Sequence, residues 1–152
     1  MPQSLANVML HIVYCTKNRE PWMTDSKIRS ELYAYNATVL RDDVDSPAIL
    51  INGVDDHVHI LCQLSRKYAI MDVIKHSKTE TTKWIKKQGS QYEKFQWQAG
   101  YGVFSVSQSN VEQVKRYIAN QEDHHKRMSF QDEFRELCRR HGLEIDERYV
   151  WE

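Results

Sequence analysis

The sequence has 152 residues, a length that suits one domain able to bury a hydrophobic core. Hydrophobic residues make up 41% and charged residues 28%, and no apolar run approaches the ~20 residues that cross a bilayer, so a membrane-spanning chain is excluded. The 21 basic and 21 acidic residues cancel, so total charge gives no indication of a nucleic-acid partner.

The N-terminus and the cysteines favour a reducing compartment. Residues 1–5 lack the basic start and the long apolar stretch of a signal peptide. The three cysteines, Cys15, Cys62 and Cys138, form neither a paired framework nor a CxxC metal knuckle. We therefore expect a cytoplasmic protein.

The first half of the sequence predicts two strands around one helix. Residues 8–14 have the composition of a strand, and a helical spacing of apolar residues runs from Ile28 to Val39. Thr24 or Asp25 can cap that helix, since a short polar side chain accepts from a free N–H of the first turn. Pro47 precedes a second strand, residues 48–51, which the turn-compatible residues 52–53 follow.

Residues 54–64 form the clearest predicted strand. Because successive strand side chains point to opposite faces, Asp56, Val58 and Ile60 are expected on one mostly apolar face. His57 and His59 are then expected on the other face, roughly 7 Å apart, where both imidazoles can approach one divalent metal. Two histidines on a solvated sheet face are the ordinary alternative, and the His-x-His spacing alone is a weak indication.

The second half adds a helix, a strand and two further helices. Apolar residues at helical spacing between Ile70 and Ile85 predict a helix, and residues 101–106 predict a strand. A long helix is expected from Ser109 or Asn110, and a shorter one over residues 130–141 that ends at Gly142. The order strand, helix, strand, strand, helix, strand predicts an α+β, ferredoxin-like split βαβ fold. We expect an antiparallel sheet with two helices on one face, and the other face free for chemistry or for a partner. We expect one domain over residues 1–152, with its core over about residues 8–128 and a helical tail at 129–152.

The long helix carries a polar stripe. Tyr117, Gln121 and His124 stand at i, i+4 and i+7, so they line up along one side of the helix. A tyrosine beside an apolar stripe is, taken alone, usually a packing residue. The paired strand histidines change that interpretation.

Together these features resemble the HUH-type single-tyrosine transposases of small insertion sequences and their repeat-associated relatives. The resemblance covers about residues 8 to 130, with the matching segments in the right order. The similar segments are His11–Val13, Thr16–Arg19, Asp55–Leu61, Trp97–Tyr101, Phe104–Val106, Tyr117–Gln121 and His124–His125.

The resemblance implies metal-dependent cleavage and rejoining of single-stranded DNA on a sheet with helices on one face plus a C-terminal catalytic helix. His57, His59 and Gln121 would hold Mg²⁺ or Mn²⁺ against the scissile phosphate. Tyr117 would attack phosphorus and leave a 5′-phosphotyrosine with a free 3′-OH, which conserves the bond for rejoining without ATP. Because a free tyrosine has a pKa of ~10, a nearby cation is expected to favour its ionised form. The candidates are Lys115, Arg116 and His124.

The resemblance also implies the partners. The family works as homodimers in which the tyrosine helix of one subunit completes the metal site of the other. Its DNA ends fold into short hairpins. Basic residues are the candidates for contacts with the DNA backbone, and aromatic residues for stacking on bases. The basic candidates are Arg66, Lys67, Lys75, Lys78, Lys83, Lys115 and Arg116, and the aromatic ones are Tyr92, Trp97 and Tyr101.

Two alternatives concern individual residues. Because the neutral amide of Gln121 is a weaker ligand than a carboxylate or an imidazole, Glu122, Asp123 or His124 can take its place after a small helix rotation. His125 is either a DNA contact, a support for the metal ligands or a surface histidine. Lysine-rich residues 66–94, with eight basic and three acidic residues, can also be simply a solvated helix face.

Three alternatives concern the function. A histidine-triad nucleotide hydrolase would need a third histidine where Leu61 stands. A non-catalytic nucleic-acid-binding module on the same fold would stack bases on sheet aromatics, whereas the central strand presents histidines. A domesticated enzyme of the same family would cleave repeat hairpins without mobilising its own element, and genomic context distinguishes it from a mobile transposase.

Overall fold

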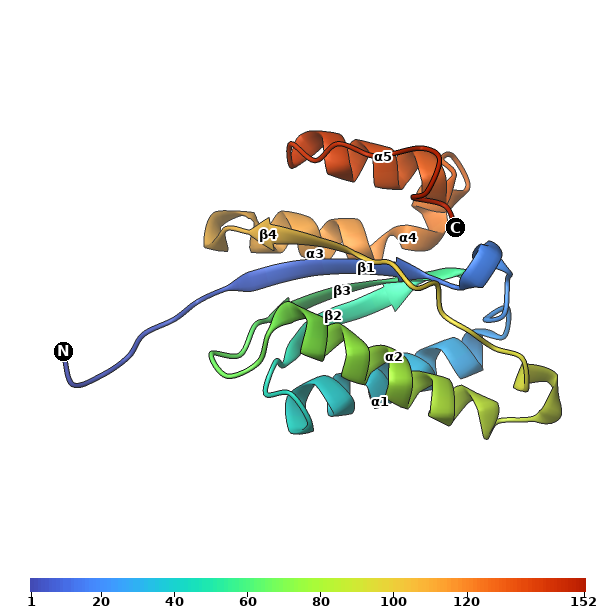
Figure 1. Ribbon diagram of the computed structural model, residues 1–152, viewed down its shortest axis with the longest axis horizontal. Coiled ribbons are helices and arrows are strands. Elements are labelled where there is room, and N and C mark those ends of the chain that lie inside the picture. The colour runs from blue at the N-terminus through green and yellow to red at the C-terminus, as the bar shows by residue number, and fades with distance from the viewer.

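The computed structural model describes residues 1–152 and places a four-stranded sheet between layers of helices (Figure 1). The strands are β1 (Met9–Cys15), β2 (Ala48–Gly53), β3 (His57–Gln63) and β4 (Gly102–Val106). They lie in the order β2-β3-β1-β4, and each neighbouring pair is antiparallel. This topology confirms the predicted ferredoxin-like arrangement.

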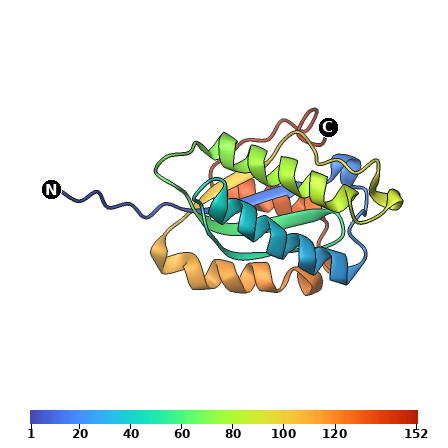
Figure 2. The same ribbon diagram turned by 90° about the horizontal axis from the view of Figure 1, so that it is seen from below.

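Helices cover both faces of the sheet, so the face that was expected to stay free is covered as well (Figure 1). Helices α1 (Ser26–Asp42) and α2 (Ile70–Lys86) lie on one face, and in Figure 2 they cross in front of the strands. On the other face lie α3 (Val111–Ala119) and α4 (Gln121–His125), with α5 (Phe130–Arg140) above them in Figure 1. The remaining elements are short 3-10 turns: η1 (Lys17–Arg19), η2 (Ser90–Tyr92) and η3 (Gln108–Asn110). None of these helices has the length and apolar character that a membrane crossing requires.

The face under α1 and α2 is an apolar core. Alternate residues of β1 and β3 point into it, which confirms the predicted two-sided pattern around Val58 and Ile60. Burying one such aliphatic side chain stabilises the fold by roughly 1.5–3 kcal/mol. The buried residues are Leu10, Ile12, Tyr14, Leu40, Val44, Val58, Ile60, Cys62, Val73 and Ile74.

The face under α3, α4 and α5 is buried as well, but its centre is polar. An apolar patch joins Val13 and Phe104 of the sheet to Phe130, Leu137 and Cys138 of α5. Beside that patch, the side chains are buried although they carry polar or ionisable groups: His11, His57, His59, Gln121 and Glu133. Strand β1 is therefore covered on both sides.

Three predicted boundaries are wrong in ways that affect the site. Strand β3 begins at His57, so Asp56 lies in the preceding turn instead of on the apolar face. Strand β2 continues through Asn52 and Gly53, and the turn follows them. A side chain at Gly53 would collide with the backbone carbonyl of His57, so this close approach requires glycine.

The third wrong boundary lies in the predicted long helix. The helix is interrupted at Asn120, whose φ of −97° and ψ of 20° are not helical, and it continues as α4. Asn52 of β2 anchors the end of α3, because its side-chain amide donates to the carbonyl of Ile118 at 2.9 Å. Tyr117 before the break and Gln121 after it still contact the same carboxylate, that of Glu133.

Candidate active site

His57 opens β3 with its imidazole held at a defined orientation. Its Nδ1 lies 2.7 Å from a carboxylate oxygen of Asp56, which leaves Nε2 directed at the buried polar centre. Burial lowers the pKa of His57, but the hydrogen bonds to Asp56 and Glu133 outweigh it and raise the pKa to about 9. Asp56 thus fixes the ring orientation and determines that Nε2 faces the other side chains of the polar centre.

His59 faces the same centre and is supported by a histidine of the neighbouring strand. Its Nδ1 lies 2.8 Å from Nε2 of His11 on β1, so Nε2 of His59 also remains for other partners. Burial, and then the charge of His59, lowers the pKa of His11 to about 3. His11 is therefore a neutral hydrogen-bonding partner.

Helix α4 brings two more side chains to His57. Nε2 of His125 lies 3.0 Å from Nε2 of His57, and Oε1 of Gln121 lies 3.4 Å from the same nitrogen. His124 lies on the side of Tyr117, with 5.2 Å between the ring centroids. The structure thus brings Gln121 to the strand histidines and places His125 among them.

Glu133 of α5 stands between these groups, with 1% of its surface exposed. Its Oε1 lies 3.0 Å from Nε2 of His59, 3.1 Å from Nε2 of His125 and 3.5 Å from Nε2 of His57. Burial raises the pKa of this carboxyl group, but hydrogen bonds to the imidazoles hold it far below its ordinary value. Glu133 is therefore a carboxylate at the centre of the cluster.

Tyr117 reaches the other oxygen of the same carboxylate. Its hydroxyl donates a hydrogen bond to Oε2 of Glu133, and Nε2 of Gln121 lies 3.3 Å from that oxygen. Burial, followed by the negative charge of Glu133, raises the pKa of Tyr117 above its ordinary value. The hydroxyl is therefore protonated in this arrangement.

Of the three cationic side chains expected beside Tyr117, only that of His124 lies next to its ring. Lys115 lies 3.7 Å from Glu112, one turn away on the outside of α3, and Arg116 is exposed. His124 is adjacent, and its buried Nε2 has no hydrogen-bond partner although Oε2 of Glu133 lies 3.1 Å away. The positive charge of Arg140 on α5 opposes the rise of the tyrosine pKa.

The donor set fits a metal ion. One donor atom from each of His57, His59, His125 and Glu133 lies within 4.8 Å of all the others. Each strand histidine also has a partner on its other ring nitrogen, the arrangement that orients metal-bound imidazoles. Nε2 of His124 is buried without a hydrogen-bond partner, so the side chains of the site leave one polar atom unpaired.

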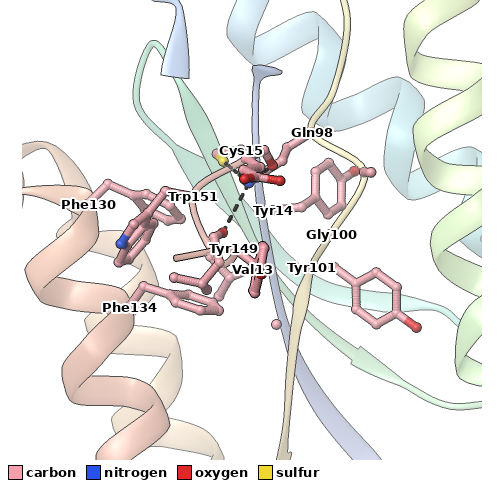
Figure 3. Close-up of a pocket in the computed structure, with 14 residues that line it drawn as sticks. Val13, Tyr14, Cys15, Gln98, Gly100, Tyr101, Phe130, Phe134, Tyr149 and Trp151 are labelled. Carbon is pink, nitrogen blue, oxygen red and sulfur yellow. Dashed lines mark hydrogen bonds between the residues drawn. The ribbon is translucent and has the colours of Figure 1, made fainter. Parts of the chain in front are cut away.

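Two hollows flank the cluster. A cavity of about 320 Å³ opens beside Tyr117 between α3 and α5, and its polar lining includes His11, Gln113 and Arg140. A second cavity, of about 290 Å³, lies between β1 and the C-terminal residues, with aromatic side chains of α5 beside it (Figure 3). The first cavity gives Tyr117 access to solvent on the side of α5.

Most of the basic candidates lie away from this cluster. Lys75 and Lys83 are exposed on α2, which covers the opposite face of the sheet, and Arg66 and Lys67 are exposed just before it (Figure 1). The ammonium group of Lys78 donates to the carbonyls of Gln98 and Gly100, both at 2.7 Å. It therefore holds the segment before β4.

The aromatic candidates differ in accessibility. Tyr92 is buried in a small core, and Trp97 packs against that core and donates from its indole N–H to Thr81 at 3.0 Å. Tyr101 is 44% exposed. Of the three, Tyr101 is exposed, Trp97 is half-buried and Tyr92 is buried.

Sequence reasoning missed three members of the cluster. His11 lay in a segment that resembles the family but was given no role at the site, and Asp56 was assigned to the apolar face. Glu133 lies in the first turn of α5, where a carboxylate is ordinary because it complements the helix dipole. Only the packing of α5 on the sheet reveals its role.

Comparison with known proteins places the chain. A family model described as "Transposase IS200 like" matches residues 4–121. A transposase candidate from Deinococcus radiodurans R1 has a similar structure, with 21% identity and a TM-score of 0.54 over 78% of this chain and 93% of its own. A REP-associated tyrosine transposase bound to a REP hairpin is similar with 9% identity and a TM-score of 0.56, over 81% of this chain and 69% of its own. At these identities the likeness shows the fold. No curated protein matches the sequence.

Proposed function

The chain belongs to the IS200-like transposases, and from that premise we propose that it cleaves and rejoins single-stranded DNA with Tyr117 as the nucleophile. One observation carries the proposal. The hydroxyl of Tyr117 is held by Glu133, which also contacts the imidazoles of His57 and His59. A nucleophilic oxygen and a metal-binding group are thus joined through one carboxylate.

The reaction assigned to Tyr117 is a transesterification. The tyrosine oxygen attacks phosphorus and gives up its proton to water. The bond from phosphorus to the 3′-oxygen breaks, and that oxygen takes a proton from water and leaves as a 3′-OH. The DNA remains joined to Tyr117 through a 5′-phosphotyrosine, which a second 3′-OH can attack to rejoin a strand.

His57, His59 and Gln121 are the proposed ligands of Mg²⁺ or Mn²⁺. The supporting geometry is the convergence of Nε2 of His57 and Oε1 of Gln121 at 3.4 Å, with His59 on the same face of β3. When bound, the cation would stabilise the charge that develops on the phosphoryl group. Asp56 and His11 would keep the two imidazoles oriented for it.

The proposed substrate is a single strand that carries a hairpin. The structural neighbour bound to a REP hairpin supports this choice. We assign the nucleotide next to the scissile phosphate to the cavity beside Tyr117, where Gln113 and Arg140 offer polar contacts. Lys115 and Arg116 on α3 are the nearby backbone contacts, and Arg66, Lys67, Lys75 and Lys83 would contact more distant DNA.

The proposed assembly is a homodimer in the cytoplasm. In this structure one chain supplies Tyr117, both strand histidines and Glu133. An exchange of α3 and α4 between two subunits would build the same site from two chains. Mixing the Tyr117→Phe and His57→Ala variants distinguishes these arrangements: recovered cleavage supports shared sites, and no recovery supports sites within one chain.

Strand cleavage tests the proposed function. Labelled hairpin-bearing single strands and the corresponding duplexes would be incubated with Mn²⁺ and either the natural protein or Tyr117→Phe. We expect cleavage of the single strand alone, its loss in Tyr117→Phe, and DNA binding that both proteins share. Cleavage by Tyr117→Phe, or equal cleavage of the duplex, contradicts the proposal.

A domesticated nuclease that processes repeat hairpins is the second candidate, and the same REP-bound neighbour favours it. Such an enzyme would use the same site but would have dispersed genomic hairpins as substrates. Sequencing of the DNA that remains attached to the protein in cells separates the two: dispersed repeats favour the nuclease, and the ends of one element favour the transposase. Full biological activity of Tyr117→Phe would instead favour a non-catalytic binding module.

A further inference from the structure

Helix α5 is fixed against the sheet by packing, and this packing places Glu133. Phe130 and Leu137 belong to an apolar cluster with Val13 of β1. Figure 3 shows Phe130 and Phe134 projecting from α5 on the side that faces Val13 of β1. The absence of a side chain at Gly102 makes room for this contact, because a methyl group there would lie 2.6 Å from the ring of Phe134. With α5 docked in this way, Glu133 faces the histidines.

The separations around Glu133 are those of neighbouring ligands on one ion. With metal–ligand bonds of ~2.1 Å, adjacent ligand atoms lie about 3.0 Å apart in an octahedron and about 3.4 Å apart in a tetrahedron. Oε1 of Glu133 lies 3.0 to 3.5 Å from three imidazole nitrogens. Nε2 of His57 and Nε2 of His125 lie 3.0 Å apart. Two such nitrogens can share at most one hydrogen, whereas both can donate lone pairs to one cation.

The chemistry of the donors supports the same conclusion. A carboxylate is a stronger ligand for a divalent cation than the neutral amide of Gln121. Glu133 is buried, so its neighbours must compensate the negative charge of its carboxylate. The groups nearest to Oε1 are imidazole nitrogens. A cation at this position would compensate the charge directly.

We propose that Glu133 and His125 are metal ligands together with His57 and His59, so that α5 completes the metal site of the proposed nuclease. This inference rests on the proposed function and deepens it: His57 and His59 remain ligands, and Glu133 and His125 take the place there given to Gln121. Oε1 of Glu133 binds the cation while Oε2 holds the hydroxyl of Tyr117, so the carboxylate also positions the nucleophile beside the metal. In this assignment Gln121 is not a ligand; its side-chain amide contacts Nε2 of His57 and Oε2 of Glu133 instead.

The assigned ligands determine the class of cation. Three imidazoles and one carboxylate suit a first-row transition-metal dication, whereas Mg²⁺ prefers oxygen ligands and keeps several waters. We therefore expect Mn²⁺ to bind at least about tenfold more tightly than Mg²⁺.

Calorimetric titration of the full chain with Mn²⁺, without DNA, tests the inference. Glu133→Gln keeps the size of the side chain and removes its charge, and Asp132→Asn is the matched control because its exposed carboxylate pairs only with Arg135. Loss of a supporting residue around a metal weakens binding about 10–100-fold, so loss of a ligand should weaken it at least tenfold. We expect this loss in Glu133→Gln and natural affinity in Asp132→Asn.

Natural or increased Mn²⁺ affinity in Glu133→Gln overturns the inference, because Glu133 would then only occupy the space next to the histidines. Equal affinities of the natural protein for Mn²⁺ and Mg²⁺ overturn the assigned ligand set. Circular dichroism must first show that Glu133→Gln is folded.

If Glu133→Gln does not fold, the ligands can be identified by anomalous diffraction from crystals of the natural protein soaked in Mn²⁺. An anomalous peak at bonding distance from Oε1 of Glu133 and Nε2 of His125 supports the inference, and a peak bound by His57, His59 and Gln121 alone overturns it. The titration contains no DNA, so a failed cleavage assay and a failed metal assignment remain distinguishable.

Discussion

The two faces of the sheet are both buried, but they are filled with different chemistry. Under α1 and α2, Val58 and Ile60 meet apolar side chains, and burial alone stabilises that layer. Under α3, α4 and α5, His57 and His59 of the same strand meet a buried carboxylate. Burying ionisable groups costs free energy unless they are paired, so the second face contributes less stability than an apolar layer would. The difference supports our proposal that the second face carries the chemistry, while the first face maintains the fold.

Among the substitutions on the face under α3, α4 and α5, which we call the chemical face, His57→Ala should slow cleavage most. The metal is expected to contribute several kcal/mol of charge stabilisation, so its loss should slow cleavage by about 10³-fold or more. Cleavage rates measured over a range of Mn²⁺ concentrations check this. Rates that stay unchanged at low Mn²⁺ would remove His57 from the metal site.

Ile60→Ala should have its effect on stability instead. The residue is fully buried, and such truncations destabilise proteins by about 2–5 kcal/mol. Chemical denaturation measures the loss, and the folded variant should bind Mn²⁺ as the natural protein does. A large loss of Mn²⁺ affinity with little loss of stability would contradict the division between the two faces.

Asp56→Asn should weaken Mn²⁺ binding about 10–100-fold, the usual effect of losing a carboxylate that orients a metal-bound histidine. The variant leaves His57 in place but exchanges its charged partner at 2.7 Å for an amide. Asp55→Asn, one residue earlier in the same turn, is the control and should keep natural affinity. Calorimetry compares the two variants, and equal affinities would mean that Asp56 does not support the site.

Lys75→Ala should have the smallest effect. If this exposed lysine contacts a phosphate, its loss should reduce the slope of log K against log salt concentration by about 0.7 for a single strand. Binding measured at several salt concentrations tests this, and an unchanged slope would assign Lys75 to the solvated surface. Lys78→Ala should instead loosen the segment before β4, since its ammonium group is used there.

The sequence predicted the parts of this comparison that depend on local pattern. Alternation along β3 placed His57 and Val58 on opposite faces because a strand has a period of two residues. The stripe from Tyr117 to His124 was also recognisable, since helical spacing is regular. The order of elements was sufficient for the sheet topology.

The remaining features depend on contacts between distant segments or on exact ends of elements. Asp56 was misplaced because the strand was expected to begin at residue 54. The strand begins at His57 instead, so Asp56 lies in the preceding turn and not on the apolar face of the strand. The break at Asn120 leaves little trace in the apolar pattern. Glu133 became part of the site through the packing of Phe130 and Leu137 on the sheet, 74 residues along the chain from His59.

The most direct test of the central claim is covalent capture of DNA on the chemical face. The protein would be incubated with a labelled pool of hairpin-bearing single strands and Mn²⁺, separated on a denaturing gel and mapped by peptide mass spectrometry. The assignment of Tyr117 predicts a DNA adduct on the peptide that contains it. An adduct on another residue, or cleaved DNA without any adduct, would contradict it.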